Sequence, residues 1–474
     1  MPTEIDTILD EYHQARQWFL SLITDPTGSR YHQDKPEDIR LQEFQEQIDR
    51  ITDFLDFMSN PQSQYHSVHV AGTSGKGSVV NMIAAILSAA ELKTGFHVSP
   101  YLQICNEKLI VDGKMIPPSE FIALVESFQE IYYDWVKSSE KYQSLQYGEA
   151  WVALTFYWMA KRQVDWAVIE TGLGGRYDPT NVLPSNLQVI TNVDYDHVVS
   201  LGPELTQIAD HKAGIIKPNG LVVTAEQKPG ILSIIRREAE KKHASLFCLG
   251  EDYNFSIQDG DSGGVRITVT TPNRKYADVR VTMQGNFQPV NAALSIASID
   301  FFTERYHLSI SEQVVRDGLD GLVYPGRMEV VQDTPLVILD GAHNSHKMQA
   351  LAGSLSTLYP DKNITAIIGM LSTKDYRGMI ELLIPITSRW IVTQPHVFGK
   401  PALPPSEIVS FIKDISPQVE VIQFDHVIDA LNKVVPESSR DDLIVVTGSL
   451  YLVGEARERW FSSRDILRDL ERDS

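Results

Sequence analysis

The sequence predicts two α/β domains, each a largely parallel sheet covered by helices. Short apolar strands alternate with amphipathic helical spans along most of the 474 residues. A glycine-rich loop lies between a predicted strand and a predicted helix at residues 68–90. From residue 328 onward, apolar strands recur at close to one per βα unit. A chain of this length is expected to divide into two or three domains with proper cores.

Composition limits the classes of partner. The apolar fraction of 43% and the charged fraction of 22% are those of an ordinary globular protein. A net charge of −20 argues against a nucleic-acid surface. The two cysteines, Cys105 and Cys248, cannot form a disulfide framework and fit a reducing compartment. The acidic start Met1–Asp6 and the lack of a run of ~20 apolar residues predict a cytoplasmic protein without a membrane partner.

Residues 1–60 are predicted to be helical and amphipathic. One stripe is formed by Phe44, Ile48, Ile51, Leu55 and Met58. Pro61 marks its end. The stripe indicates a core-facing helix ahead of the first strand, and this segment is too short for a separate α/β domain.

The glycine-rich loop is Gly72-Thr73-Ser74-Gly75-Lys76-Gly77-Ser78. Such a loop directs several backbone N–H groups toward one point, beside the positive end of the helix dipole. Lys76 adds a mobile positive charge, and the Ser78 hydroxyl is placed to bind a magnesium ion held by the same phosphates. A flexible surface turn is the alternative, but the strand before and the helix after favour nucleoside triphosphate binding.

Further strands are predicted to end in polar groups beside this loop. The strand at 165–170 delivers Glu170 and then continues into glycines, which suggests an acid facing the phosphates. A helix-capping or salt-bridged glutamate is the alternative. The strand at 189–194 leads to Asp196-His197, where His197 is either a metal ligand or a hydrogen-bonded structural residue; alone, it favours the structural role. The strand that ends at Ser99-Pro100 leads into a loop typical of ligand binding.

The rest of the chain is predicted to complete the two domains. Residues 251–285 alternate apolar and polar side chains, which predicts an antiparallel addition to the first sheet. Helices are expected at 290–300 and 311–320, and a hinge at 323–327. The strands of the second domain are predicted at 336–339, 364–368, 390–393, 419–422 and 443–447. Polar residues follow several of them, namely Asp340, His343, Asn344, Lys374, Asp375 and Ser449. Because they would face the phosphate loop, they predict an interdomain active site.

These motifs, taken together, resemble the folylpolyglutamate synthase family, the folate branch of the Mur ligases, from about residue 65 to 457. The matching segments after the phosphate loop are Ser99-Pro100-Tyr101-Leu102 with Asn106-Glu107, Glu170 to Arg176 with Asp178 and Asn181, Asp196-His197, Lys212 to Lys217, Gln288 with Asn291 to Leu294, Pro325 to Glu329, Asp340 to Asn344, and Gly448 to Gly454. The resemblance implies a Mur-ligase-type ATPase domain at 1–322, a hinge at 323–327 and a Rossmann-like domain at 328–474.

The resemblance also implies an activity. The expected reaction is ATP-dependent addition of L-glutamate to the glutamyl carboxylate of a reduced folate through an acyl phosphate. Dihydropteroate would be a possible second acceptor, giving dihydrofolate. ATP and two Mg²⁺ ions are the expected cosubstrate and metals, and a monomer is the expected state.

By the same resemblance, individual residues receive roles. The implied magnesium ligands are Ser78, Glu170, His197 and Lys212, with Lys212 carbamylated because an ammonium cannot coordinate a cation. The implied catalytic residues are Lys76, Glu170, His197, Lys212 and His343. The implied nucleotide contacts, beyond the loop residues 72–78, are Asn291 to adenine, Arg327 to phosphate and Asp340 to ribose. The implied substrate contacts are Ser99, Pro100, Tyr101, Asn106, Glu107, His343 and Ser449, the last for the incoming glutamate.

The chain departs from the family pattern at several positions. Phe287 stands where the family usually has His, Lys108 where it has Arg, and Lys400-Pro401 where it has Arg-Ala. Gly148-Glu149 replaces a Phe-Glu pair, and Ser372 to Asp375 alters an Asp-Lys-Asp pattern. The change to Lys108 removes a bidentate contact. The departures lie mostly around the pterin and second-substrate regions, so they bear on acceptor choice more than on ATP chemistry.

Three alternatives are open. A Mur ligase acting on another carboxylate is the nearest, although peptidoglycan ligases carry a separate domain before the phosphate loop. A role like that of cyanophycin synthetase would need a large preceding portion. A nucleotide-binding module without ligase activity would be favoured if Asp340, His343 and Ser449 were missing, and they are present.

Overall fold

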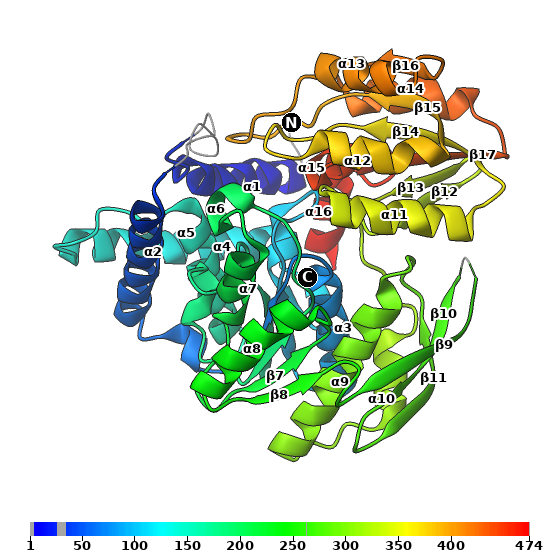
Figure 1. Ribbon diagram of the computed structural model, residues 1–474. Coiled ribbons are helices and arrows are strands. Elements are labelled where there is room, and N and C mark those ends of the chain that lie inside the picture. The colour runs from blue at the N-terminus through cyan, green and yellow to red at the C-terminus, as the bar shows by residue number, and fades with distance from the viewer. Residues whose placement is uncertain (1–3, 26–34, 262, 474) are drawn as a thin grey trace.

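The computed structural model describes residues 4–25, 35–261 and 263–473, and it contains two α/β domains (Figure 1). The first sheet has eight strands, in spatial order β4 (Lys114–Met115), β3 (Ile110–Val111), β2 (Thr94–His97), β5 (Trp166–Glu170), β1 (His66–Ala71), β6 (Leu187–Ile190), β7 (Leu221–Thr224) and β8 (Ser245–Cys248). Neighbouring strands from β2 to β8 are parallel, while β3 pairs antiparallel with both β2 and β4. The predicted mixed α/β fold class is confirmed.

Helices cover both faces of this sheet. They are α1 (Glu4–Ser21), α2 (Glu37–Phe57), α3 (Lys76–Ala89), α4 (Pro118–Ser138), α5 (Tyr147–Lys161), α6 (Val198–Leu201), α7 (Leu205–Ala213), α8 (Pro229–Lys241), α9 (Gln288–Tyr306) and α10 (Glu312–Leu319). Strand alternation divides the core in β5, because Val168 packs with α3 and α9 whereas Ala167 and Ile169 pack with α4 and α5. The second core is rich in aromatic side chains, as the composition of residues 119–162 predicted.

Strands β9 (Asn254–Asp261), β10 (Gly264–Thr270) and β11 (Lys275–Val281) form a separate antiparallel sheet. The prediction of an antiparallel addition to the first sheet is therefore wrong in its attachment, although the strands themselves are confirmed. The apolar faces of these strands, for example Val269 and Val279, are buried in the core that includes α9. The alternating pattern identifies a sheet with one buried face, but it does not say what covers that face.

The second domain contains a six-stranded sheet in the order β12 (Glu329–Asp333), β13 (Leu336–Leu339), β17 (Asp442–Thr447), β14 (Asn363–Ile368), β15 (Thr387–Val392) and β16 (Glu420–Gln423). All neighbours are parallel except β12, which pairs antiparallel with β13. Its helices are α11 (Ser345–Leu358), α12 (Tyr376–Leu383), α13 (Pro405–Ile415), α14 (Val427–Glu437) and α15 (Leu450–Arg457). Short 3-10 turns are η2 (Pro61–Ser63), η3 (Cys105–Lys108), η4 (Pro179–Val182) and η5 (Ile384–Ile386).

The last helix, α16 (Ser463–Arg472), leaves the second domain and packs on the first. Leu467 is buried in the aromatic core with α1, α4 and α5, and Glu471 accepts a hydrogen bond from the Ser119 backbone at 2.9 Å. The predicted unit 328–474 therefore ends, as a packed body, before this helix. Among the described residues, no helix is long and apolar enough to cross a membrane.

Candidate active site

A cavity of about 1430 Å³ lies between the two domains and the first two helices. The first domain contributes Ser99, Tyr101, Lys108 and the segment 194–201, while the second contributes Lys374 and Lys400, among others. The walls thus combine strand-end loops of both sheets, as expected for a ligand site at the carboxyl ends of parallel strands. The predicted interdomain placement agrees with this geometry.

The phosphate loop is anchored to the segment that follows β6 by close packing and hydrogen bonds. Gly72 lies so close to β6 that a Cβ there would be 1.8 Å from Thr191 Oγ1, so only glycine fits. The hydroxyl of Thr73 donates to the Asp194 carbonyl at 2.9 Å and accepts from its N–H, also at 2.9 Å. The Ser74 backbone N–H donates to Asn192 Oδ1 at 2.9 Å. The loop is therefore fixed before any ligand arrives.

The start of α3 places three groups of the loop. Gly75 precedes the helix with φ +80°, a conformation that favours glycine. A Cβ on Gly77 would lie 2.4 Å from the hydroxyl of Tyr324, so the segment 323–327, the predicted hinge, packs directly over the helix start. Ser78 is 2% exposed and accepts a long hydrogen bond of 3.4 Å from Gln288 Nε2.

Glu170 faces the loop, as its strand-end position predicted. Its Oε1 lies 3.7 Å from Lys76 Nζ, and its Oε2 accepts a hydrogen bond from the Ser99 backbone at 3.1 Å. The carboxylate therefore joins the phosphate loop to the loop after β2. The salt-bridged glutamate of the alternative interpretation is observed, and the role of Glu170 beside bound phosphates stays a prediction.

His197 and Asp196 come from the segment after β6. His197 has φ +50°, an uncommon left-handed conformation that often marks functional positions. Its imidazole is 46% exposed, into the cavity. Burial lowers the pKa of His197 to about 3. Asp196 opposes this effect, whereas the positive charges of Lys374 and Lys347 add to the decrease. The imidazole is therefore neutral, which is the form that binds a metal.

Asp196 connects the two domains. Its Oδ1 lies 3.1 Å from Nζ of Lys374 in the second domain. Burial would raise the pKa of Asp196, but His197, Lys374, Lys347 and His343 hold it well below its usual range. Asp196 is thus the carboxylate that balances part of the positive charge from both sheets.

Lys212 lies on α7 with its side chain directed at the loop. Its Nζ donates to the Gly72 carbonyl at 2.8 Å. Burial and, next, Lys76 lower the pKa of Lys212 to about 7. A free amine is the form that reacts with carbon dioxide, so the environment suits the carbamylation that the family resemblance implies.

The donors present fit a magnesium ion. Ser78 offers a hydroxyl with a weak existing bond, Glu170 a buried carboxylate, and His197 a neutral imidazole. Oxygen donors supplemented by phosphate oxygens are what Mg²⁺ prefers. Ser78 and Glu170 both border Lys76, whose charge in turn affects the pKa of His197 and of Lys212. Glu170 and Lys212 lie beside the phosphate loop, while joint binding of a metal by these two residues with Ser78 and His197 stays a prediction.

In the second domain, His343 lies at the start of α11. Its Nδ1 is 2.8 Å from the Gly341 carbonyl, so Nδ1 carries the proton. Its Nε2 is then free to accept from Lys347 Nζ, 2.9 Å away. Burial, followed by Lys347 and Lys374, holds the pKa of His343 well below its usual range. His346, three residues after His343, contacts Ser74 Oγ of the phosphate loop at 3.2 Å through its Nδ1.

Asp340 and Arg327 are close together, but the Asp340 carboxylate already has partners. Its oxygens accept from the backbone N–H groups of Met328 and Ala342, both at 2.9 Å. It is 4% exposed, and burial raises its pKa. Arg327 donates to the Gly326 carbonyl and lies over the Tyr324 ring. Contacts of Asp340 to ribose and of Arg327 to phosphate stay predictions.

The loop after β2 contains both cavity-lining and structural residues. Ser99, Pro100 and Tyr101 line the cavity. Asn106 is fully buried. Its amide N–H donates to the Ile116 carbonyl, and its amide oxygen accepts from the Tyr12 hydroxyl. Glu107 accepts from three backbone N–H groups, those of residues 102, 103 and 104. Both side chains shape the loop, and the contacts of Asn106 and Glu107 to substrate stay predictions.

Two further predicted residues lie at loop ends. Asn291 donates to Gln288 Oε1 at 3.0 Å and packs against Gly75. Ser449 is the N-cap of α15 and accepts from the Tyr451 N–H at 3.3 Å. Asn291 therefore borders the phosphate loop, while the contacts of Asn291 to adenine and of Ser449 to glutamate stay predictions.

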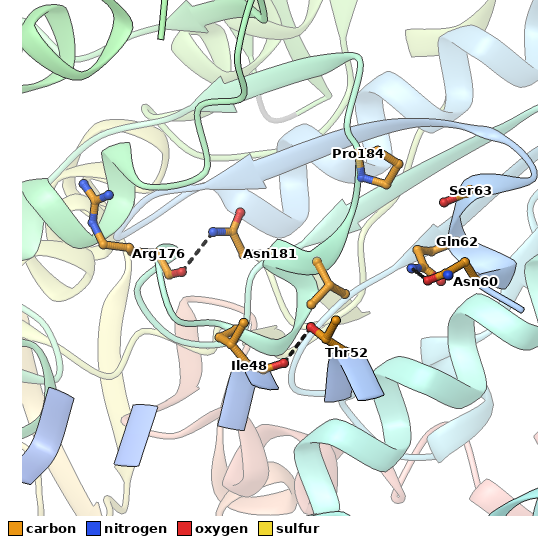
Figure 2. A pocket seen from close by; sticks show the side chains of 9 residues that line it. Ile48, Thr52, Asn60, Gln62, Ser63, Arg176, Asn181 and Pro184 are labelled. Carbon is orange, nitrogen blue, oxygen red and sulfur yellow. Dashed lines mark hydrogen bonds between the residues drawn. The ribbon is translucent and has the colours of Figure 1, made fainter. Parts of the chain in front are cut away.

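A second, smaller cavity of about 440 Å³ lies among α2, η2 and η4 (Figure 2). The labelled side chains Asn60, Gln62 and Asn181 surround it, together with Arg176. None of the phosphate-loop residues lines it. Arg176 is bonded to Asp210 and Glu238, so this cavity is set apart from the chemistry described above.

Sequence reasoning missed Lys347, and it named Asp196 and Lys374 without their mutual contact. Lys347 lies on the first turn of α11, four residues after His343, which lies in the loop before that helix. That spacing, at the start of a helix behind the Asp340–Asn344 segment, is the signal that could have identified it. The Asp196–Lys374 pair joins residues 178 positions apart, and no local pattern could reveal it.

Comparison with known proteins agrees with this geometry. Residues 70–299 match the Mur ligase middle domain, and residues 326–450 match the Mur ligase glutamate ligase domain. The dihydrofolate synthase/folylpolyglutamate synthase of Bacillus subtilis is 32% identical over 87% of this chain and 94% of the relative. The folylpolyglutamate synthase of Lacticaseibacillus casei is 32% identical over 86% of this chain and 93% of the relative.

Solved structures give the same result. Mycobacterium tuberculosis folylpolyglutamate synthase complexed with ADP has a TM-score of 0.84 at 27% identity, covering 96% of this chain and 99% of the other. A folylpolyglutamate synthase complex with AMPPCP and folate has a TM-score of 0.75 at 30% identity, covering 86% of this chain and 94% of the other. The chain belongs to the folylpolyglutamate synthase family of the Mur ligases.

Proposed function

We propose that this chain is an ATP-dependent ligase that joins L-glutamate to the glutamyl carboxylate of a reduced folate. The observation that supports the proposal is the contact of a formed phosphate loop with the second domain, between Ser74 and His346 at 3.2 Å. The cavity is lined from both domains, by Asp196 and His197 of the first and by His346 and Lys374 of the second. The relatives named above act in folate metabolism by name, and one related structure holds an ATP analogue together with folate.

The first chemical step is transfer of the terminal phosphoryl group to the folate carboxylate, giving an acyl phosphate and ADP. Transferring phosphoryl groups spread charge over their oxygens, so the protein mainly positions groups and neutralises charge. The N–H groups of residues 72–78 and the Lys76 ammonium do this from the first domain. The cations of the second domain, held beside Asp196, do it from the other side.

In the second step, the amine of free glutamate attacks the acyl carbonyl, and phosphate leaves. Water would hydrolyse the acyl phosphate, so the site must exclude it. The interdomain contacts Ser74–His346 and Asp196–Lys374 bring both loops together over the reacting groups. Closure of the domains around bound substrates would then complete the site.

Two magnesium ions are part of the proposal. Ser78 and Glu170 would hold one, and Glu170, His197 and a carbamylated Lys212 would hold the second. Bound there, the ions would neutralise phosphate charge and clamp the attacking and leaving oxygens. A crystallographic or intact-mass search for one added carbon dioxide on Lys212 is the direct check, and an unmodified lysine in active, metal-loaded protein would remove that role.

The acceptor side is proposed to take a carboxylate-bearing pteridine, with dihydropteroate as a second acceptor. Lys108 and Lys400 both line the cavity, from opposite domains. Burial lowers the pKa of Lys108 to about 8, with Glu170 opposing and Lys400 adding to the effect. Two lysines at positions where the family usually has arginine would bind substrate carboxylates as point charges rather than as planar forks.

We further propose that the enzyme acts as a monomer in the cytoplasm. The residues that line the described cavity come from both domains and from the first two helices of a single chain. Both cysteines are buried free thiols, which suits a reducing compartment.

The proposal is tested with purified protein, Mg²⁺, ATP and L-glutamate, and with tetrahydrofolate or dihydropteroate as acceptor. We expect ADP and a glutamylated acceptor to form in equal amounts. If tetrahydrofolate but not dihydropteroate gives product, the acceptor is a reduced folate. If both compounds give product, the enzyme is bifunctional. No acceptor-dependent ADP with either compound would refute the function.

A further inference from the structure

Lys347 lies on the first turn of α11, at the boundary between the two domains. Its Nζ is 2.9 Å from His343 Nε2. Because His343 keeps its proton on Nδ1, the lysine donates one of its three N–H bonds to the imidazole. The other two donors point away from His343 and have no partner in the part of the chain that the structure describes.

The charge around Lys347 is mostly of its own sign. In the described residues, no carboxylate lies within 4.0 Å of its ammonium. Asp196, the acid that influences it most, is engaged by Lys374 at 3.1 Å. Burial lowers the pKa of Lys347 to about 7. Asp196 opposes this effect, whereas the cations Lys76, Arg327 and Lys374 add to it. An enclosed ammonium among cations is costly unless an anion joins it.

The place where that anion would sit is the phosphate loop. The residue before Lys347, His346, contacts Ser74 of the loop at 3.2 Å. Lys76 of the loop also lowers the pKa of Lys347. In loops of this type the lysine reaches the β- and γ-phosphates. Lys347 therefore approaches the same end of the nucleotide from the opposite domain.

We propose that Lys347 binds the terminal phosphate of ATP, with His343 orienting its ammonium. This inference rests on the proposed ATP-dependent function and adds a phosphate-binding residue to it. Lys347 would therefore favour binding of ATP over ADP, because ADP lacks the terminal phosphate that its ammonium binds. Binding of ATP would thereby draw the second domain onto the phosphate loop through one charge-assisted hydrogen bond.

The test compares nucleotide binding by Lys347→Met, Lys347→Arg and wild type, in the full-length protein with Mg²⁺. Methionine keeps the length of the side chain and removes its charge, while arginine keeps the charge. Lys413→Met, at an exposed lysine on α13, is the matched control. Calorimetric affinities are measured for ADP and for a non-hydrolysable ATP analogue, without folate or glutamate.

We expect Lys347→Met to weaken binding of the analogue by about 10- to 100-fold, as for loss of a hydrogen bond between charged groups. ADP affinity should change less than about threefold, Lys347→Arg should retain most of the selectivity, and the control should match wild type. Equal affinities of Lys347→Met and wild type for the analogue would overturn the inference, and so would an equal loss for ADP and the analogue.

A purely structural lysine would behave differently. Removing a structural hydrogen bond lowers the melting temperature of the nucleotide-free protein, whereas removing an unpaired enclosed charge leaves it unchanged or raises it. We expect no decrease for Lys347→Met, and a clear decrease would contradict the inference. Since no ligation is measured, a failure of the proposed folate activity would leave this result standing, and the two failures can be told apart.

Discussion

The two sheets present opposite electrostatic faces to the cavity between them. In the first domain, charges come in pairs, with Lys76 beside Glu170 at 3.7 Å and Lys228 beside Asp194 at 3.1 Å. In the second domain, Lys374 pairs with Asp196 across the boundary, and Lys347 has an imidazole as its partner. The first face offers Asp196 to the second domain, whereas the second face holds excess positive charge. We infer that the second domain depends on Asp196 and on bound phosphate to dock.

The largest effect is expected when one of the paired charges of the first domain is removed. Lys76→Ala and Glu170→Ala should each lower the rate of glutamate ligation by about 100- to 1000-fold, because each group acts on developing phosphate charge. Circular dichroism and melting should show an intact fold. Ligation at the wild-type rate in both variants would refute the assignment of the site.

The next effect concerns the boundary itself. Asp196→Asn removes the acid that balances Lys374 and Lys347, so we expect turnover to fall by about 10- to 100-fold. Steady-state kinetics of this variant, of Lys374→Met and of the double variant form a double-mutant cycle. Because the two groups share one contact, the effects should be non-additive. Simple additivity would show that the pair does not act as a unit.

Helix α16 allows the stability of the first domain to be tested separately from that of the second. Leu467 belongs in sequence to the second domain but is buried in the core of the first. Leu467→Ala should lower the free energy of unfolding by about 2–4 kcal/mol, as for loss of a buried leucine. Hydrogen exchange should rise in α1 and α4 and not in α12 or α13. A rise confined to the second domain would show that α16 packs elsewhere.

The smallest effect is a pH dependence of stability without nucleotide. The pKa of Lys347 is about 7 in the fold, below its ordinary 10.5. The unfolded chain then binds more protons between these values, so stability from this group rises as pH rises through that window. The melting temperature of Lys347→Met relative to wild type should therefore be highest at about pH 7 and below, and the two should converge at about pH 10.5. His343 is neutral throughout, since its pKa is held well below its usual range. A difference that grows with pH would contradict the charge argument.

The sequence predicts the parts that depend on local pattern. The five parallel strands of the second sheet were placed within three residues at each end, because each is an apolar run between helices. The phosphate loop and Glu170 were also identified, since strand, glycines and helix follow one another in the chain. Strand β6 ends at Ile190 rather than at 194, which leaves Asn192 and Asp194 free to fix the loop.

Contacts between distant segments could not be predicted. Strand β12 is partly exposed and lacks a buried apolar run, so it gave no signal. The separate sheet of β9 to β11 and the return of α16 to the first domain depend on which surfaces meet. The burial of Asn106 beneath Tyr12 is of the same kind. A motif shared with a family identifies such a residue, but it does not distinguish a loop-shaping role from substrate binding.

The central claim is that both domains act together on ATP, a folate carboxylate and glutamate. The most direct measurement is the release of ADP by the wild-type protein as each substrate is omitted in turn. We predict one ADP for each glutamate joined to tetrahydrofolate, with little ADP when either acceptor or glutamate is absent. Steady ADP release that is indifferent to both, or no release with all three present, would contradict the account.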